Sequence, residues 1–137
     1  MAVVEELLRS EENGGISFGN HKLEQKAKLE DYQHAGDLLK VKTYKEITKL
    51  EKNGMFLYES VPGTSVLHFV ETEDSVEFLA EGDEDAQITI GLDEEKDYEV
   101  FVNGNSIGIM NTGLSGKLSL SVELEAAGEV PVKIVRE

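Results

Sequence analysis

The sequence predicts an all-β protein, an antiparallel β-sandwich preceded by a hairpin-rich N-terminal region. Short runs alternate between apolar and polar residues, turn residues recur about every ten positions, and no segment has the length and caps of a clear helix. Turns at this spacing are typical of sandwiches and barrels. We therefore expect two regions, an N-terminal β-hairpin region at residues 1–60 and an acidic β-sandwich domain at residues 61–137.

Two Asn-Gly pairs give the clearest hairpin signals. Asn103-Gly104 lies between two alternating runs, at 98–102 and 107–110, and Asn53-Gly54 joins the runs at 47–51 and 55–58. Asn-Gly suits a type I′ turn because both central residues of that turn adopt positive φ. Both pairs therefore predict tight hairpins.

The remaining strands follow from the same alternation. The run at 117–124 is the most regular, because its four apolar residues all fall on one face of a half-buried strand. In chain order, the other predicted strands are 38–44, 66–71, 75–80, 86–90 and 130–135.

Two segments remain ambiguous between helix and strand. The apolar residues within 3–9 have the spacing of a helix face, but the segment begins with β-branched residues and leads into a glycine turn. The charged segment 21–31 is compatible with a helix of two or three turns.

Charge and composition exclude several functions. The formal net charge is −15, of which −13 lies in residues 61–137 and −2 in residues 1–60. This net charge argues against binding to nucleic acid or to anionic membranes, because neutralising phosphate groups requires clustered lysine and arginine. The absence of cysteine excludes disulfides, thiolate zinc sites and cysteine nucleophiles. The first residues do not resemble a signal peptide and no apolar run is long enough to span a bilayer, so we expect a cytoplasmic protein.

The acidic loop 81–85 is the strongest candidate for a metal site. Asp83 and Asp85 are spaced closely enough to begin a calcium cage, although the EF-hand pattern is missing. The alternative interpretation is a solvated turn. We therefore assign no metal ligand on this pattern alone.

No other pattern identifies catalytic or cofactor-binding residues. The three histidines, His21, His34 and His68, are not spaced as a metal motif, and we expect His68 at the surface or at a sheet edge. Neither a nucleophile elbow nor a phosphate-binding glycine loop is present. The sequence therefore predicts a protein that is not an enzyme and has no cofactor.

Tyr32, Tyr44 and Tyr58 are the aromatic residues best placed to stack on a sugar, with packing in the core or at an edge as the alternative. A sugar-binding module is therefore compatible with the sequence, but is not indicated by it.

Two segments, Lys45–Thr64 and Gly116–Leu124, resemble a group of small proteins of anaerobic Gram-positive bacteria, some of which are labelled endosialidases. The resemblance extends over nearly the whole chain and implies a bacterial protein of unknown role. Sialidases bind the sialate carboxylate with an arginine cluster, whereas this chain has two arginines, Arg9 and Arg136. We therefore do not predict sialidase activity.

A second resemblance concerns Tyr98–Leu124, which is similar to the last strands of immunoglobulin-like and fibronectin-type modules. It implies an immunoglobulin-like form of the sandwich and no particular function.

The leading functional hypothesis is a structural or interaction protein that forms a homo-oligomer, through strand edges or through the near-neutral N-terminal half. Closed rings and open filaments are both compatible with such contacts. The alternative is a carbohydrate- or ligand-binding β-module, assisted by calcium at Asp83 and Asp85. A hydrolase with paired carboxylates is a third hypothesis, but no spacing selects a pair.

Overall fold

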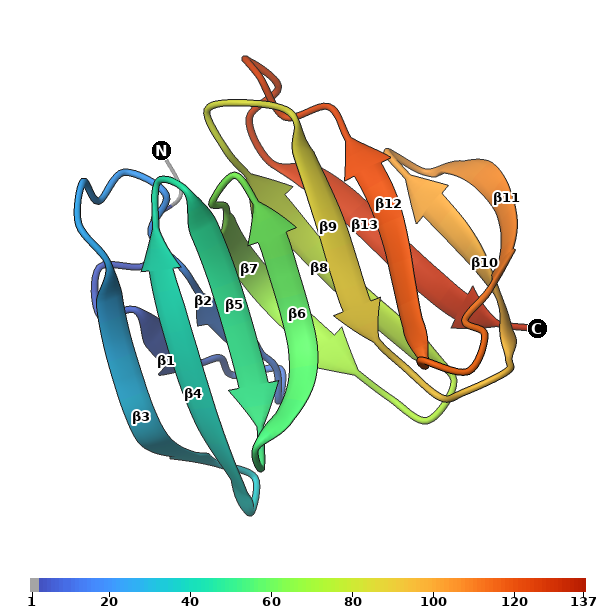
Figure 1. Ribbon diagram of the computed structural model, residues 1–137, viewed down its shortest axis with the longest axis horizontal. Coiled ribbons are helices and arrows are strands. Elements are labelled where there is room, and N and C mark those ends of the chain that lie inside the picture. The colour runs from blue at the N-terminus through green and yellow to red at the C-terminus, as the bar shows by residue number, and fades with distance from the viewer. Residues whose placement is uncertain (1–2) are drawn as a thin grey trace.

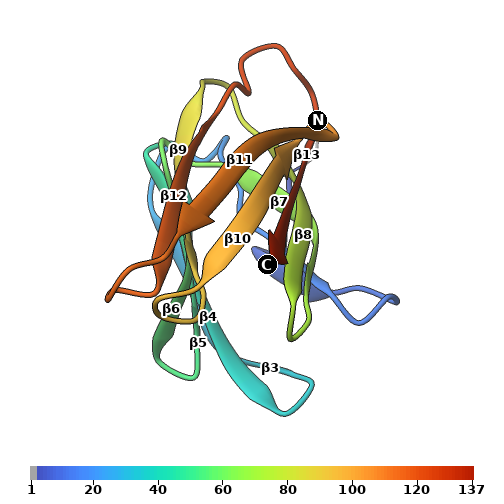
Figure 2. The same cartoon turned by 90° about the vertical axis from the view of Figure 1, so that its right-hand side faces the viewer.

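The computed structural model describes residues 3–137 as two antiparallel sheets packed face to face (Figures 1 and 2). Residues 1–2, the start of the predicted N-terminal region, lie outside the described part. All thirteen assigned elements are strands, so residues 3–137 hold no helix that could cross a membrane. The strands are β1 (Leu8–Ser10), β2 (Ile16–Phe18), β3 (Ala27–His34), β4 (Asp37–Tyr44), β5 (Ile47–Lys52), β6 (Met55–Val61), β7 (Ser65–Glu71), β8 (Ser75–Glu81), β9 (Ala86–Gly91), β10 (Asp97–Val102), β11 (Asn105–Asn111), β12 (Lys117–Val122) and β13 (Val130–Arg136).

Both halves of the chain contribute to both sheets. The seven-stranded sheet has the order β1-β2-β7-β8-β13-β10-β11, and the six-stranded sheet has the order β12-β9-β6-β5-β4-β3. Strand β2 pairs with β7, and β6 pairs with β9, so the regions before and after residue 60 adjoin within each sheet. The division into two domains at residue 60 stays a prediction.

The predicted hairpins have the expected backbone. Asn53 and Gly54 have φ values of 53° and 78°, and Asn103 and Gly104 have values of 54° and 80°. Positive φ at both central residues is what a type I′ turn requires. The structure therefore confirms the all-β class, the sandwich and the two Asn-Gly turns.

The helical alternatives are wrong. Residues 21–26 form an irregular loop, and the chain then enters β3, in which Leu29 and Tyr32 pack against the core. Residues 8–10 form β1, and Leu7 has a φ of 72°, which a right-handed helix cannot contain. The end of each segment is a strand because it finds an antiparallel partner, β4 for β3 and β2 for β1.

An aromatic cluster joins the two sheets at the centre of the core. Tyr58 comes from the six-stranded sheet, and Phe18, Phe69 and Phe78 come from the seven-stranded sheet. The Tyr58 ring centroid lies 5.1 Å from that of Phe18 and 5.7 Å from that of Phe78, both in edge-to-face geometry. Such aromatic pairs add about 0.5–1.5 kcal/mol beyond the burial of their area.

The Tyr58 hydroxyl is satisfied inside the core. It is hydrogen-bonded to the Thr64 hydroxyl at 2.8 Å, and Thr64 is bonded in turn to Ser60, also at 2.8 Å. All three side chains are fully buried. Burial raises the pKa of Tyr58 far above its ordinary value, so the phenol stays protonated and can donate.

We expect Tyr58→Phe to lower the free energy of unfolding by about 1–2 kcal/mol, because the buried threonine hydroxyl loses a partner. Urea denaturation followed by circular dichroism measures the change. Tyr32→Phe is the matched control: its hydroxyl bonds to Ser10 at an exposed site, so it should change stability by less than about 0.5 kcal/mol. Equal effects of the two substitutions would contradict the structural role of the buried network.

Candidate functional site

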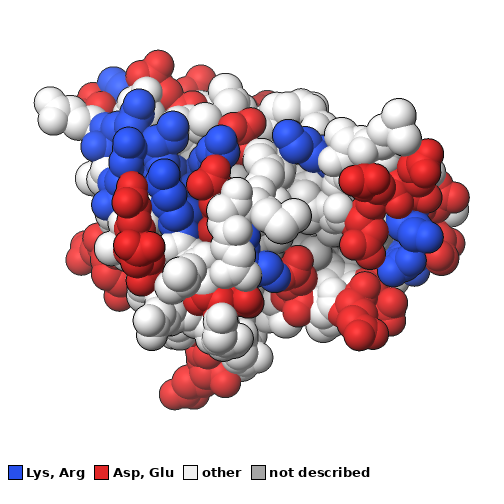
Figure 3. All heavy atoms as spheres, turned by 60° about the horizontal axis from the view of Figure 1, so that its bottom comes forward, with Lys and Arg blue, Asp and Glu red and all other residues white. Residues whose placement is uncertain are grey.

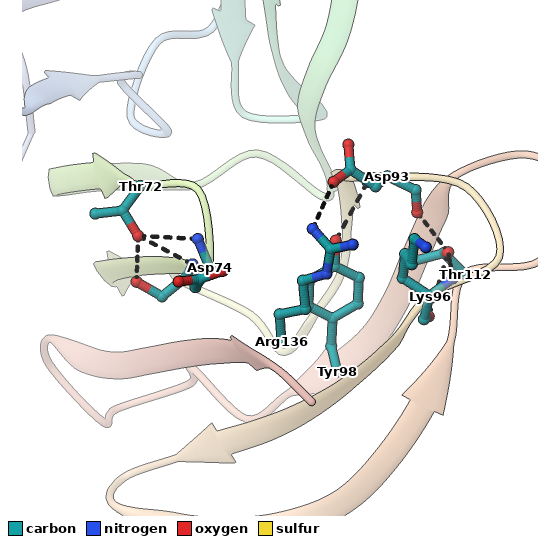
Figure 4. A network of polar contacts seen from close by, with 8 residues as sticks. Thr72, Asp74, Asp93, Lys96, Tyr98, Thr112 and Arg136 are labelled. Carbon is teal, nitrogen blue, oxygen red and sulfur yellow. Dashed lines mark hydrogen bonds and ion pairs between the residues drawn. The ribbon is translucent and has the colours of Figure 1, made fainter.

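A polar hollow lies at one end of the sandwich, where the β7–β8 turn, the β9–β10 loop and the end of β13 meet (Figure 4). Its volume is about 370 Å³. The lining residues are Glu71, Thr72, Glu73, Asp74, Ser75, Val76, Leu92, Asp93, Tyr98 and Arg136.

Arg136 and Asp93 are the charged pair at the centre of this hollow. The Arg136 Nη1 atom lies 3.3 Å from Asp93 Oδ2, and the Asp93 backbone N–H donates to the Tyr98 hydroxyl at 3.3 Å. The backbone N–H of Arg136 donates to the Asp74 carbonyl at 2.7 Å. Arg136 therefore contacts both the β9–β10 loop and the β7–β8 turn, which line the hollow.

Hydroxyl groups order the two loops around this pair. Thr112 donates to the Asp93 carbonyl at 2.6 Å and accepts from the Lys96 N–H at 3.1 Å. On the opposite side, Thr72 accepts from the backbone N–H groups of Asp74 and Ser75. These bonds are side chain to backbone and hold the loop shapes.

Carboxylates outnumber cations around the hollow. Glu71, Glu73, Asp74 and Asp93 line it together with one guanidinium, and Asp93 already neutralises that group. The hollow therefore suits a cationic or hydroxyl-rich ligand better than an anion. The sequence did not identify this site, because Asp93 and Arg136 are 43 residues apart.

Asp83 and Asp85, the predicted calcium residues, have different partners. Asp83 pairs with the Lys22 ammonium, whereas Asp85 accepts the backbone N–H groups of Leu124 and Glu125 at 3.0 and 3.2 Å. Within residues 3–137 no group of three or more histidine, aspartate or glutamate side chains is placed to hold a metal ion. The calcium site stays a prediction.

His21 is the buried titratable group that the sequence did not identify. Its Nδ1 atom lies 2.7 Å from the Ser65 hydroxyl. Its Nε2 atom has no hydrogen-bond partner among residues 3–137 and lies 3.7 Å from Asp83 Oδ1. Burial has the largest effect and lowers the pKa of His21; Asp83 opposes it, Lys22 lowers the pKa further, and Glu81 raises it slightly. This loop lacks the apolar–polar alternation of a strand, so the burial of His21 could not be predicted from the sequence.

The other candidate side chains are dispersed. His68 is exposed at a bulge in β7, which confirms its predicted surface position. His34 bonds through its ring nitrogens to Ser10 and to the Gly14 carbonyl. Tyr58 is fully buried and offers no platform to a sugar, while Tyr32 and Tyr44 are half-buried.

A second surface feature lies at the edge of the seven-stranded sheet. Strand β11 carries Ile107 and Ile109, which are 51% and 60% exposed. Beside it is a hollow of about 450 Å³ in the outer face of the sheet. Apolar side chains of Phe101, Pro131, Val132 and Val135 line much of it.

We expect stability to fall as the pH drops below about 6.5, since the unfolded His21 then binds a proton that the buried ring does not. The loss should level off below the lowered folded-state pKa. His21→Asn should flatten this part of the pH profile, measured by urea denaturation between pH 7.5 and 5. His34→Asn, a change at a half-buried histidine, is the control and should keep the wild-type slope.

Comparison with known proteins identifies no similar protein. No family model, no curated protein and no solved structure matches the chain. The resemblance of Lys45–Thr64 to small bacterial proteins therefore stays an expectation, and a functional assignment depends on the surfaces described above.

Proposed function

We propose that this protein is a non-enzymatic interaction protein that associates with itself through the exposed edge of strand β11. One observation carries the proposal: β11 is a seven-residue edge strand without a charged side chain, in a chain of net charge −15. Unpaired backbone groups on such an edge can pair with another strand.

The other three edge strands are protected in ways that β11 is not. Strand β1 is three residues long and carries Arg9, and β12 carries Lys117. Strand β3 contains three charged residues, Lys28, Glu30 and Asp31. Short length and charge both discourage edge-to-edge pairing, which leaves β11 as the edge most open to a partner.

The sequence of β11 is nearly symmetric about Gly108. Asn105 and Asn111 stand at its two ends, and Ile107 and Ile109 flank the glycine. If two copies pair antiparallel about Gly108, each Ile107 faces the partner's Ile109. Cross-strand apolar pairs are stabilising, and a two-fold axis makes the contact self-complementary.

Charge favours this edge over the charged surfaces as a contact between copies. Two chains of net charge −15 repel each other, and the repulsion is least where neither surface carries charge. Salt screens that repulsion. Association through β11 should therefore strengthen as the salt concentration rises, whereas an interface of ion pairs would weaken.

We expect Ile109→Lys to convert the assembled protein to a monomer, because it places a charge at the centre of the contact. Size-exclusion chromatography with light scattering, at low and high salt, measures the mass. Leu114→Lys is the control: Leu114 is 79% exposed in the β11–β12 loop, outside the proposed contact, so its mass should stay that of the wild type. A wild-type protein that is monomeric at all micromolar concentrations and salt levels would refute the proposal.

Single cysteines test the register of the pairing, because the chain has none of its own. A mixture of the Ile107→Cys and Ile109→Cys variants should form a disulfide between copies faster than either variant alone. Equal rates in the mixture and in the separate variants would contradict pairing about Gly108.

A ligand-binding module is the second candidate, favoured by the hollow around Arg136 and Asp93. Its hydroxyl and carboxylate groups match a polyhydroxyl ligand such as a sugar. In the calcium-assisted form, calcium would raise the melting temperature and Asp83→Ala would abolish the rise. The absence of any shift in millimolar calcium, together with a blank glycan array, would dismiss this candidate.

The immunoglobulin-like form of the sandwich is also a proposal. It is supported by the hairpin of β10 and β11, after which the chain crosses to β12 in the other sheet. This form carries no function of its own.

A further inference from the structure

A row of lysines crosses three neighbouring strands on the outer face of the six-stranded sheet. Lys28 of β3 lies directly opposite Lys42 of β4, and Lys42 lies directly opposite Lys49 of β5. Together with Lys40 and Glu51, these three side chains line a hollow of about 120 Å³. Figure 3 shows the positive side chains gathered in a patch at the upper left, away from the acidic groups at the right.

Three like charges in register destabilise a sheet. The Cβ atoms of directly opposite residues are separated by about 4.5–5.5 Å, so their charges repel. Within residues 3–137, neither Lys28 nor Lys42 forms an ion pair. Lys42 is half-buried at the middle of the row, with a lysine on either side. A bound anion would relieve this repulsion.

Acidic residues border the row and limit its extent. Lys40 lies 3.7 Å from Glu30, and Lys49 lies 3.8 Å from Glu51. Glu59 of β6 is directly opposite Lys49 and closes the row on that side. A ligand that reached beyond the three lysines would therefore meet carboxylates.

We propose that Lys28, Lys42 and Lys49 bind one phosphate or sulfate group carried by a small molecule. Ammonium groups make charge-assisted hydrogen bonds to such oxyanions. An extended polyanion would lie over the bordering acids and would be repelled by the net charge of −15. A small dianion interacts mainly with charges within about 10 Å, which is the screening length at ordinary salt. The more distant negative charges of the chain therefore repel it less than they repel an extended polyanion. The site is independent of strand β11.

Titration with pyrophosphate at constant ionic strength, followed by amide shifts in ¹⁵N NMR spectra, tests the proposal on the full chain. We expect saturable shifts confined to β3, β4 and β5, and Lys42→Gln should weaken the affinity by about fivefold. Lys133→Gln is the matched control, since it removes the same charge from the opposite sheet and should leave the affinity unchanged. A parallel titration with sulfate distinguishes a phosphate ligand from a sulfate ligand.

Melting temperatures without ligand give a second readout. Lys42→Gln should raise the melting temperature, because it relieves repulsion, while Lys133→Gln should lower it slightly, because Lys133 lies opposite Glu77. Pyrophosphate should stabilise the wild type and Lys133→Gln more than it stabilises Lys42→Gln. Linear shifts without saturation, equal responses of the two variants, or binding of a heparin oligosaccharide without binding of pyrophosphate would overturn the proposal.

Discussion

The contact between Tyr58 and the phenylalanines of the opposite sheet is the interaction on which the rest of the structure depends. Tyr58 is the residue of the six-stranded sheet that meets Phe18, Phe69 and Phe78 at once. Its hydroxyl also needs a partner in the core, and Thr64, next to the start of β7, supplies it. The aromatic packing holds the sheets together, and the hydrogen bond ties the chain at the point where it passes from β6 to β7.

Once the inner faces are used for packing, the outer faces and the edges are left for function, and the two sheets differ there. The outer face of the six-stranded sheet carries the lysine row, whereas that of the seven-stranded sheet carries an apolar hollow beside an uncharged edge. The two surfaces should respond oppositely to salt, because screening weakens anion binding and relieves the repulsion between copies. Function can therefore be examined separately at each of them.

Much of the fold could be predicted from local pattern, and the exceptions have physical causes. The run at 117–124 alternates strictly and Asn103-Gly104 suits one turn type, so the turn was predicted correctly and the strand to within two residues of its end, since β12 spans Lys117–Val122. Strands β1 and β2 are three residues long, too short to show a period, and β3 is interrupted by a bulge near Asp31 that breaks its alternation. From the sequence, Asp83 and Asp85 could be considered as calcium residues, but neither the burial of His21 nor the pairing of Arg136 with Asp93 could be predicted.

By itself, the sequence determined the all-β class, the Asn-Gly turns and the concentration of negative charge after residue 60, because each depends on neighbouring residues or on composition. The tertiary structure alone decided which strands adjoin. In the structure, β13 lies between β8 and β10, and Lys28, Lys42 and Lys49 lie in one row. The physical reason is that alternation shows which face of a strand is buried, whereas its partner and register are chosen by the packing of the whole core.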